Sequence, residues 1–269
     1  MKCKECHRQL EDGKVRCQRC GAWNVKVAIP LNKYVIRLTD AKLGVVERIV
    51  TGLVDLVFGG GIVDTSVTLL GGEPGAGKTT LCLQLASIFT TKFKSDNRIV
   101  LYIANEQDGS EIRSTAERLD LPNADNIFIV NAMGGVDFDI GELLLQYKPC
   151  LVILDSLTKW AGDDPGLAVF IAQRLKEYAV KLKCPMIAIS QVTKDDDYAG
   201  LNKLKHEVDL LAMFDILEGE LDANGVAIPK NESPRRLMST KNRNGPAPEE
   251  QFFQMTELGL VQIQLQPLE

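Results

Sequence analysis

A glycine-rich segment of the form GxxxxGK[ST] limits the possible folds of this chain more than any other pattern in its sequence. It runs from Gly72 to Thr79 and follows the short apolar run 67–70. The next residues, 80–93, carry apolar side chains at helical spacing. A strand, a glycine-rich turn and a helix in this order form a phosphate loop, in which backbone N–H groups at the start of the helix bind nucleotide phosphates. The sequence therefore predicts an ATP site.

Individual side chains of this loop have separate expected roles. Lys78 would reach the β- and γ-phosphates, and the Thr79 hydroxyl would be a ligand of Mg²⁺. The predicted nucleotide-binding residues are Gly72, Glu73, Pro74, Gly75, Ala76, Gly77, Lys78, Thr79, Thr80 and Asp155.

Three further apolar runs are typical of buried parallel strands: 98–104, 150–154 and 185–190. Each is followed by a polar residue, and the carboxyl ends of parallel strands meet at one edge of a sheet. Glu106 is expected to orient the water that attacks the γ-phosphate. Asp155, in the position of a Walker B aspartate, is expected to hold Mg²⁺. Gln191 is expected to sense the γ-phosphate.

Helical patterns alternate with these runs and occupy 79–93, 109–119, 139–147 and 166–183. Asp108 and Glu111 form a capping box at the start of the second helix. Strands that alternate with helices predict an α/β fold with a mainly parallel sheet and right-handed crossovers.

The N-terminus carries two CxxC knuckles ten residues apart, formed by Cys3, Cys6, Cys17 and Cys20. Two such turns supply the four thiolates of a closed tetrahedral zinc site. About 25 residues cannot bury a useful core, so the metal would provide most of the folding free energy of this module. Two alternatives are a CxxCH haem attachment, because His7 follows Cys6, and a thioredoxin-like redox pair. A second CxxC disfavours both, and His7 is expected at the surface, or else as a substitute ligand.

The domain organisation follows from these segments. We expect a zinc finger at 1–26, a linker at 27–47 and an ATPase core at 48–269. The remaining cysteines are scattered among apolar residues, as in a reducing compartment: Cys82, Cys150 and Cys184. The N-terminus has no signal-peptide pattern, and no apolar run reaches the roughly 18 residues that cross a bilayer. A cytoplasmic protein without a membrane partner is expected.

Charge is distributed unevenly along the chain. The net charge is −5, which disfavours a protein that coats nucleic acid by bulk attraction. Residues 1–37 nevertheless hold nine Lys and Arg against three acids, and residues 230–243 hold five against one. These basic segments are either local phosphate contacts or ordinary solvated surface.

The order of the motifs resembles the bacterial RadA (Sms) family over nearly the whole chain. The shared motifs are CxxCxxWN at 17–24, GGGIV at 59–63, the phosphate loop at 71–80, VTKxxxxAG at 192–200, HxVD at 206–209, KNRxG at 241–245 and MTExGL at 255–260. The resemblance implies a RecA-like ATPase core that assembles as a hexameric ring. It also implies that Lys241 and Arg243 act across the subunit interface on the γ-phosphate of a neighbour.

The resemblance further implies a function on DNA. A member of this family would be a DNA-dependent ATPase and translocase that acts on single-stranded or branched DNA in recombination, branch migration and repair. Its zinc finger would recruit a recombinase or another replication or repair protein. The segments 158–166 and 194–205 would be loops that line a DNA channel. Lys194, Lys203 and Lys205 favour this role, whereas the acids 195–197 in the same loop would repel phosphates.

Three departures from the family pattern leave alternatives open. The chain ends at Glu269, before the protease-like C-terminal domain of the family, so we expect a short form. Gln191 stands where the family more often has His, and Asn244 where it has Phe; both are similar to DnaB-type replicative helicases. A minimal replicative helicase and a nucleotide-switched binding protein with little hydrolysis are the alternatives. His206 either couples the loop to DNA or packs beside Val208.

Overall fold

The computed structural model describes residues 2–3, 5–10, 16–22, 37–40, 46–133, 140–162, 164–191, 198–217 and 233–264, without the side chains of 40 and 198–202. The chain forms two compact units, 1–45 and 46–269. Apart from one 3₁₀ turn at Leu38–Asp40, all helices and strands of the described residues belong to the second unit.

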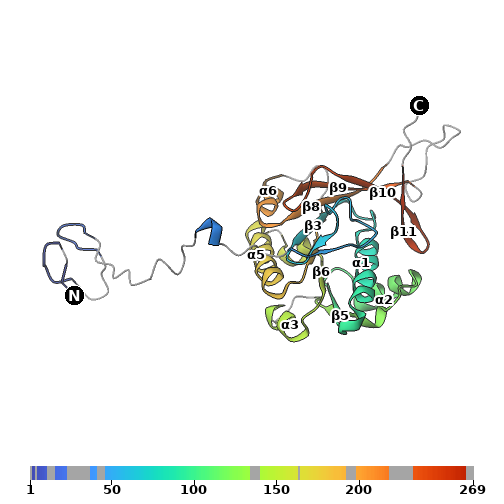
Figure 1. Cartoon of the computed structure of the whole chain (residues 1–269), viewed down its shortest axis with the longest axis horizontal. Coiled ribbons are helices and arrows are strands. Elements are labelled where there is room, and N and C mark those ends of the chain that lie inside the picture. The colour runs from blue at the N-terminus through green and yellow to red at the C-terminus, as the bar shows by residue number, and fades with distance from the viewer. Residues whose placement is uncertain are drawn as a thin grey trace, which may run out of the picture. The chain divides into compact units, whose positions relative to one another are not determined.

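The second unit is built on a nine-stranded sheet in the order β11-β10-β9-β8-β3-β7-β6-β4-β5 (Figure 1). The six strands from β8 to β5 in this order are all parallel to their neighbours. The remaining three, at the other side of β8, pair antiparallel. The parallel strands are β3 (Val67–Gly71), β4 (Val100–Ala104), β5 (Ile127–Asn131), β6 (Leu151–Asp155), β7 (Met186–Ile189) and β8 (Leu210–Ile216).

The antiparallel strands form the C-terminal part of the sheet: β9 (Arg235–Asn242), β10 (Glu250–Thr256) and β11 (Gly259–Ile263). A separate two-stranded ribbon joins β1 (Arg48–Ile49) to β2 (Ile62–Val63) just before the parallel sheet begins. The mainly parallel α/β sheet predicted from the sequence is confirmed by this topology.

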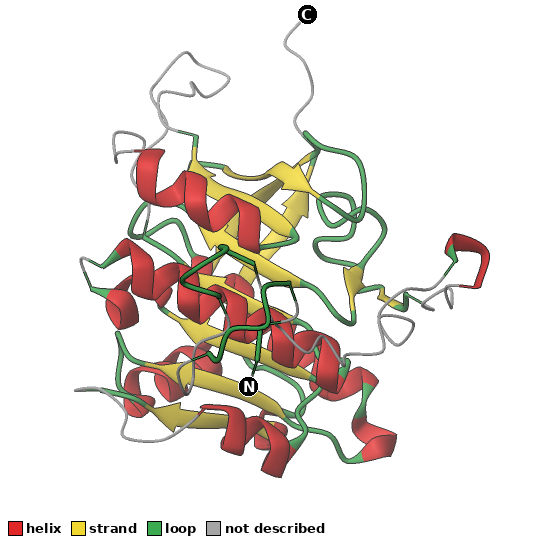
Figure 2. Cartoon of the chain, turned by 90° about the vertical axis from the view of Figure 1, so that its left-hand side faces the viewer, coloured by secondary structure: helices red, strands yellow, loops and turns green. Residues whose placement is uncertain are grey.

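Helices cover both faces of the sheet, because successive side chains of a strand point to opposite faces and those of β3, β4 and β6 are buried at every position. In β4, Tyr102 packs into a core with α1 (Lys78–Lys92) and α2 (Gly109–Arg118). Its neighbours Leu101 and Ile103 point the other way, into a second core. Figure 2 looks towards the helices of that second core: α3 (Ile140–Tyr147), α4 (Leu157–Ala161), α5 (Pro165–Leu182) and α6 (Tyr198–Glu207).

Local signals explain where several helices begin. The Asp108 carboxylate accepts hydrogen bonds from the backbone N–H groups of Ser110 and Glu111, which confirms the Asp108 half of the predicted capping box of α2. Asp164 caps α5 in the same way, and Pro165 occupies its first turn.

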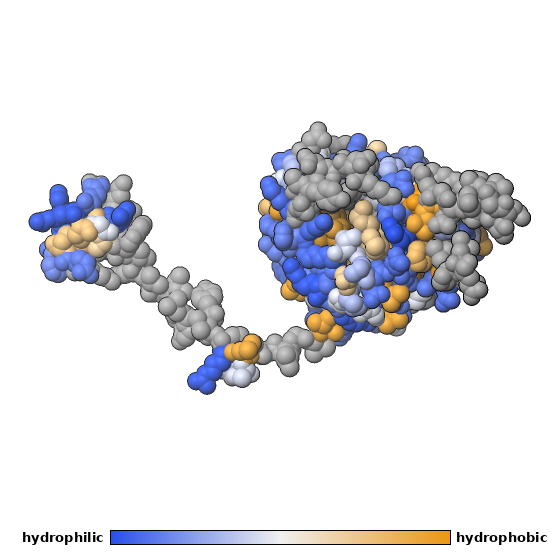
Figure 3. All heavy atoms as spheres, turned by 90° about the horizontal axis from the view of Figure 1, so that it is seen from above, coloured by the Kyte–Doolittle hydropathy of each residue, from blue (hydrophilic) through white to orange (hydrophobic). Residues whose placement is uncertain are grey.

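On the face that Figure 3 shows, hydrophilic residues surround smaller hydrophobic areas of the described surface.

Two segments predicted as loops contain helices. α4 occupies the start of 158–166, because Ser156 caps it and Leu157 and Ala161 are buried. α6 occupies much of 194–205, because Leu204 and Val208, four residues apart, are buried in the same core as α5. Residues 192–197, with Lys194 and the three acids, lie outside the described residues, as do Trp23 and Asn24.

Candidate functional site

The phosphate loop joins β3 to α1 in the centre of the parallel sheet. Gly77 precedes α1 in a left-handed conformation with a φ of 103°. Gly72 has a φ of 142°, and a Cβ atom at this position would lie 2.1 Å from the carbonyl oxygen of Phe214 in the adjacent strand β8. The loop therefore depends on glycine at position 72 for two reasons, its backbone conformation and the closeness of β8.

Lys78 folds back over the loop. Its ammonium group donates hydrogen bonds to the carbonyl oxygens of Gly72 at 2.7 Å and Glu73 at 2.9 Å. Burial lowers the pKa of Lys78, while the nearby carboxylates of Glu106 and Asp155 act in the opposite direction. The ammonium group is thus held where a phosphate would offer it better partners than two carbonyls.

Asp155 lies at the end of β6, opposite the first turn of α1. Its Oδ2 accepts a hydrogen bond of 2.9 Å from the Thr79 hydroxyl and one of 2.5 Å from the Tyr102 hydroxyl. Burial raises the pKa of Asp155, and these two hydrogen bonds counteract that effect. A hydroxyl and a carboxylate, both hard oxygen donors, fit the ligand preference of Mg²⁺.

Glu106 and Gln191 meet across the same cleft. The Gln191 side-chain amide donates a hydrogen bond to the Glu106 carboxylate. The backbone N–H of Gln191 donates to the Thr158 hydroxyl at 3.0 Å, which also lies 3.0 Å from the Ser190 hydroxyl. Gln191 is therefore linked both to the expected catalytic carboxylate and to the start of α4.

These groups line a cleft of about 810 Å³ at the carboxyl edge of the parallel strands. The sequence prediction missed several of the side chains at this site: Tyr102, Arg118, Thr158, Ser190, Arg235 and Met255. Arg118 is held by a hydrogen bond to the carbonyl oxygen of Glu257, and Met255 lies against the position of a Cβ on Gly77. Such contacts join distant segments and carry no local sequence signal.

The described residues that line this cleft do not include Lys241 or Arg243. In the antiparallel pair β8–β9, Arg235 lies opposite Ile216 and Lys241 lies opposite Leu211. Arg235 and Ile216 line the cleft. Lys241 lies six residues further along β9 than Arg235, which places it roughly 20 Å from Arg235 at about 3.3 Å per residue. The two cations are thus at the opposite end of the sheet from the nucleotide cleft of their own chain.

The end of β9 and the turn that follows it, which carry these cations, pack on the glycine-rich segment before β2. Asn242 donates a hydrogen bond of 3.3 Å to the carbonyl oxygen of Val57, and Arg48 donates to that of Asn244. A Cβ on Gly59 would lie 3.0 Å from the Cα of Gly245. The GGGIV and KNRxG motifs, far apart in sequence, therefore form one contact.

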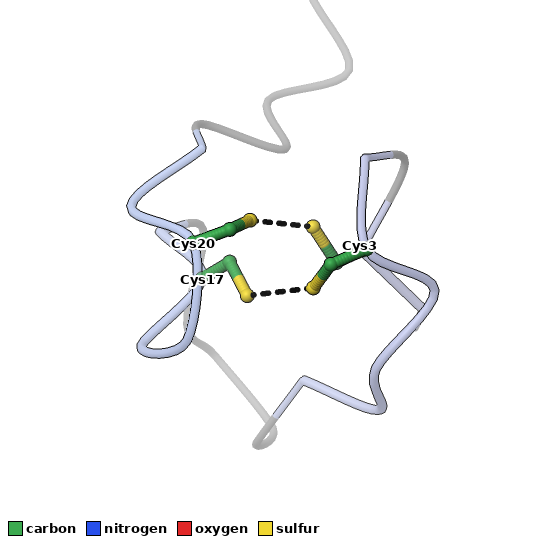
Figure 4. A group of neighbouring side chains, drawn as sticks. Cys3, Cys17 and Cys20 are labelled. Atoms are coloured by element: carbon green, nitrogen blue, oxygen red, sulfur yellow. Dashed lines mark hydrogen bonds between the residues drawn. The ribbon is translucent and has the colours of Figure 1, made fainter.

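The four N-terminal cysteines form a cluster in the first unit, with all sulfurs within 4.8 Å of one another. The sulfurs of Cys3 and Cys20 are 3.6 Å apart, as are those of Cys6 and Cys17, and Figure 4 shows Cys3 facing the other knuckle. A tetrahedral Zn²⁺ with Zn–S bonds of about 2.3 Å separates its sulfurs by about 3.8 Å. The cluster fits such an ion, and its distances exceed the roughly 2.05 Å of a disulfide.

The two knuckles share one backbone pattern. The carbonyl oxygens of Cys3 and Cys17 accept hydrogen bonds from the N–H groups of His7 and Gly21, each four residues later. His7 and Gly21 both have positive φ, at 60° and 73°. His7 is exposed and therefore occupies the turn position that glycine fills in the second knuckle.

Some of the residues that were expected to approach DNA lie in α6 and are described by the structure. Lys203 is exposed and Lys205 half-buried. His206 is also exposed, whereas Val208 is buried.

In the part of the chain that the structure describes, no helix is both long and apolar enough to span a membrane.

The fold and the cleft define a P-loop nucleotide-binding protein with an α/β core. Residues 54–197, just over half of the chain, match the family described as "AAA domain", and the chain belongs to this family. Such a domain implies a bound nucleotide and Mg²⁺.

Comparison with curated proteins gives a closer resemblance. The chain is 30% identical to the DNA repair protein RadA of Aquifex aeolicus, over 97% of this chain and 59% of that protein. It is 30% identical to RadA of Haemophilus influenzae and 27% identical to RadA of Bacillus subtilis, each over 97% of this chain and 58% of the relative. The predicted resemblance to RadA is confirmed, and the chain spans about three-fifths of the length of these relatives.

Proposed function

We propose that this chain is a DNA-dependent ATPase of recombination and repair whose active site is completed by a neighbouring copy. The separation of two sets of residues carries the proposal. The phosphate loop, Asp155, Glu106 and Gln191 converge at one end of the sheet, whereas Lys241 and Arg243 lie at the other. Cations placed there cannot serve the nucleotide of their own chain, so they would act in a ring, for which we propose six copies.

Each residue then has a role in phosphoryl transfer. The loop N–H groups and Lys78 bind the phosphates, and Thr79 and Asp155 would hold Mg²⁺, which neutralises charge on the β- and γ-phosphates. Glu106 orients the attacking water, and Gln191 reports whether a γ-phosphate is present. The neighbour's Lys241 and Arg243 stabilise the charge of the transition state, an effect of roughly 10³–10⁵-fold for an arginine supplied in trans.

The task on DNA is proposed from the relatives, whose name is DNA repair protein RadA. Single-stranded or branched DNA would pass beside α6, where the exposed Lys203 would contact phosphates. Translocation along this DNA would drive branch migration. Zinc bound by the four cysteines would keep the N-terminal unit folded, and this unit would recruit a recombinase or another repair protein.

The test is the ATPase rate of the full chain without DNA and with single-stranded, duplex and branched DNA. We expect stimulation by single-stranded or branched DNA, and its loss in Lys78→Ala. Native mass spectrometry with and without nucleotide would measure the ring. Absence of any DNA stimulation would contradict the proposal.

Two outcomes would identify another function. Efficient unwinding of a simple fork without a recombinase would support a minimal replicative helicase, the alternative to which Gln191 and Asn244 point. Near-zero turnover on every DNA, with nucleotide-dependent DNA binding, would support a switched binding protein.

A further inference from the structure

The contacts of Lys241 and Arg243 within their own chain form an anchor at the end of α6. The Lys241 ammonium donates hydrogen bonds to the carbonyl oxygens of Lys205 and Val208, the latter at 2.9 Å. The Arg243 guanidinium donates to the carbonyl oxygen of His206 at 3.3 Å. Carbonyls at a helix C-terminus have no partners within the helix and carry the negative end of its dipole. The end of α6 therefore holds both cations.

Asp209 fixes this anchor to the sheet. It lies directly before β8, and its side chain is only 3% exposed. Its Oδ1 lies 3.4 Å from Arg243 Nη1, and its backbone carbonyl accepts a hydrogen bond of 2.8 Å from the Arg243 N–H. Its Oδ2 accepts hydrogen bonds from the Lys176 ammonium at 2.5 Å and the Val67 N–H at 2.9 Å.

One carboxylate thus contacts three separate segments of the chain. Lys176 belongs to α5, Val67 begins β3, and Arg243 follows β9, while α6 ends two residues before Asp209. A buried carboxylate that is paired on both oxygens has a fixed position, since moving it would leave a charge without partners. Arg243, by contrast, has a side chain that is 54% exposed, so its position depends on the groups that hold it.

We infer that Asp209 is a positioning residue that sets Arg243 for use on a neighbour's nucleotide and ties it to α6. Displacement of α6 by DNA would therefore move both cations together. This inference rests on the proposed function for its consequence, but the link between α6 and the end of β9 is a property of the chain itself.

The first test measures ATP hydrolysis by Asp209→Asn in the full chain. Because the side chain keeps its size but loses its charge, we expect kcat with DNA to fall by roughly 10–10²-fold, as for a misplaced catalytic group. The KM for ATP should change by less than about twofold, since Asp209 is not among the described residues that line the nucleotide cleft. A rise of the KM for ATP as large as the fall of kcat, or an unchanged kcat, would overturn the inference.

Asp215→Asn is the matched control, because Asp215 is also a buried aspartate and, from within β8, pairs with Arg236 of β9 at 3.7 Å. Its contacts lie at the other end of the strand, away from Lys241 and Arg243. Similar losses of kcat in both variants would show a general effect of β8 and would contradict a specific role for Asp209.

Hydrogen exchange provides a readout that is independent of any activity on DNA. In Asp209→Asn, we expect the amides of 203–208 and of 240–243 to lose protection together, while those of β6 remain protected. Deprotection of only one segment would overturn the link even if the wild-type ATPase proved insensitive to DNA. An insensitive wild type with linked exchange would contradict only the proposed function.

Discussion

At the scale of single residues, Asp155 is held between two opposing influences. Burial raises its pKa, and the hydrogen bonds from Tyr102 and Thr79 lower it. The Tyr102 hydroxyl is itself buried in the core beneath the cleft. Tyr102 therefore helps to keep Asp155 ionised, which is the form that a divalent cation requires.

We predict that Tyr102→Phe narrows the pH range of ATP hydrolysis from the acid side. Removing a hydrogen bond that lowers the pKa of Asp155 leaves burial unopposed, so this pKa rises further. Mg²⁺-dependent hydrolysis should then be lost at a higher pH than in the wild type, with little change above neutrality. The measurement is kcat against pH at saturating ATP and a fixed Mg²⁺ concentration below saturation, where protons compete with the metal for Asp155.

Tyr147→Phe provides the control, because Tyr147 is 42% exposed and its ring contacts Phe128 rather than the cleft. Its acid limb should coincide with that of the wild type. Coincidence of all three profiles would show that Tyr102 does not tune Asp155.

At the scale of elements, the turn between β3 and α1 is specified by its packing as well as by its glycines. Gly72 is adjacent to the backbone of β8, where a Cβ would come within 2.1 Å of a carbonyl oxygen. Backbone in the middle of a sheet cannot move aside without breaking ladder hydrogen bonds. This position should therefore tolerate no side chain.

We predict that Gly72→Ala destabilises the chain on the order of 3 kcal/mol or more, the range of severe core mutations. Gly60→Ala is the control, since Gly60 also has positive φ, at 96°, but has nothing within 4 Å of an added Cβ. It should cost only about 1 kcal/mol of backbone strain. Denaturant unfolding of both variants measures the difference, and equal costs would contradict the proposed clash with β8.

The cysteine knuckles give a prediction about metal content. We expect about one zinc ion per chain by metal analysis, and its loss in Cys17→Ser, because four thiolates close the tetrahedral site. His7→Gly should retain the metal, because His7 occupies a left-handed turn position that glycine adopts at lower cost. Loss of zinc from His7→Gly would instead identify the histidine as a ligand.

At the scale of the whole molecule, the distance between the cleft and the two cations makes the site dependent on assembly. We predict that Lys78→Ala and Arg243→Ala are each inactive alone and regain activity when mixed. In a randomly mixed ring at equal ratio, about a quarter of the interfaces pair an intact phosphate loop with intact cations. The DNA-stimulated ATPase of the mixture should therefore approach about a quarter of the wild-type rate.

Arg236→Ala controls for the loss of an arginine from β9, because Arg236 pairs with Asp215 and Glu250 and not with the end of α6. It should keep most of its activity alone. A mixture that remains inactive under conditions where the variants exchange subunits would exclude action in trans.

Much of the fold could be predicted from the sequence because its signals are local. Continuous apolar runs identified β3, β4, β6 and β7, and helical spacing identified α1, α2, α3 and α5. The phosphate loop and the cysteine knuckles were also recognised in the sequence, since their chemistry depends on spacing within a few residues. The strands β1, β2, β5 and β8 to β11 and the helices α4 and α6 were not predicted. The apolar faces of β5, α4 and α6 are short and gain their partners only in the folded chain.

The phosphate loop, the polar residues at the ends of parallel strands and the four-thiolate cluster can all be read from the residue order. The support of Asp155 by Tyr102, the anchoring of Arg243 by Asp209 and the distance of Lys241 from its own cleft became known from the folded chain. The difference lies in the range of the interactions along the sequence. Spacing along the chain fixes turns and faces, whereas strand order and antiparallel register fix which distant side chains share an end of the sheet.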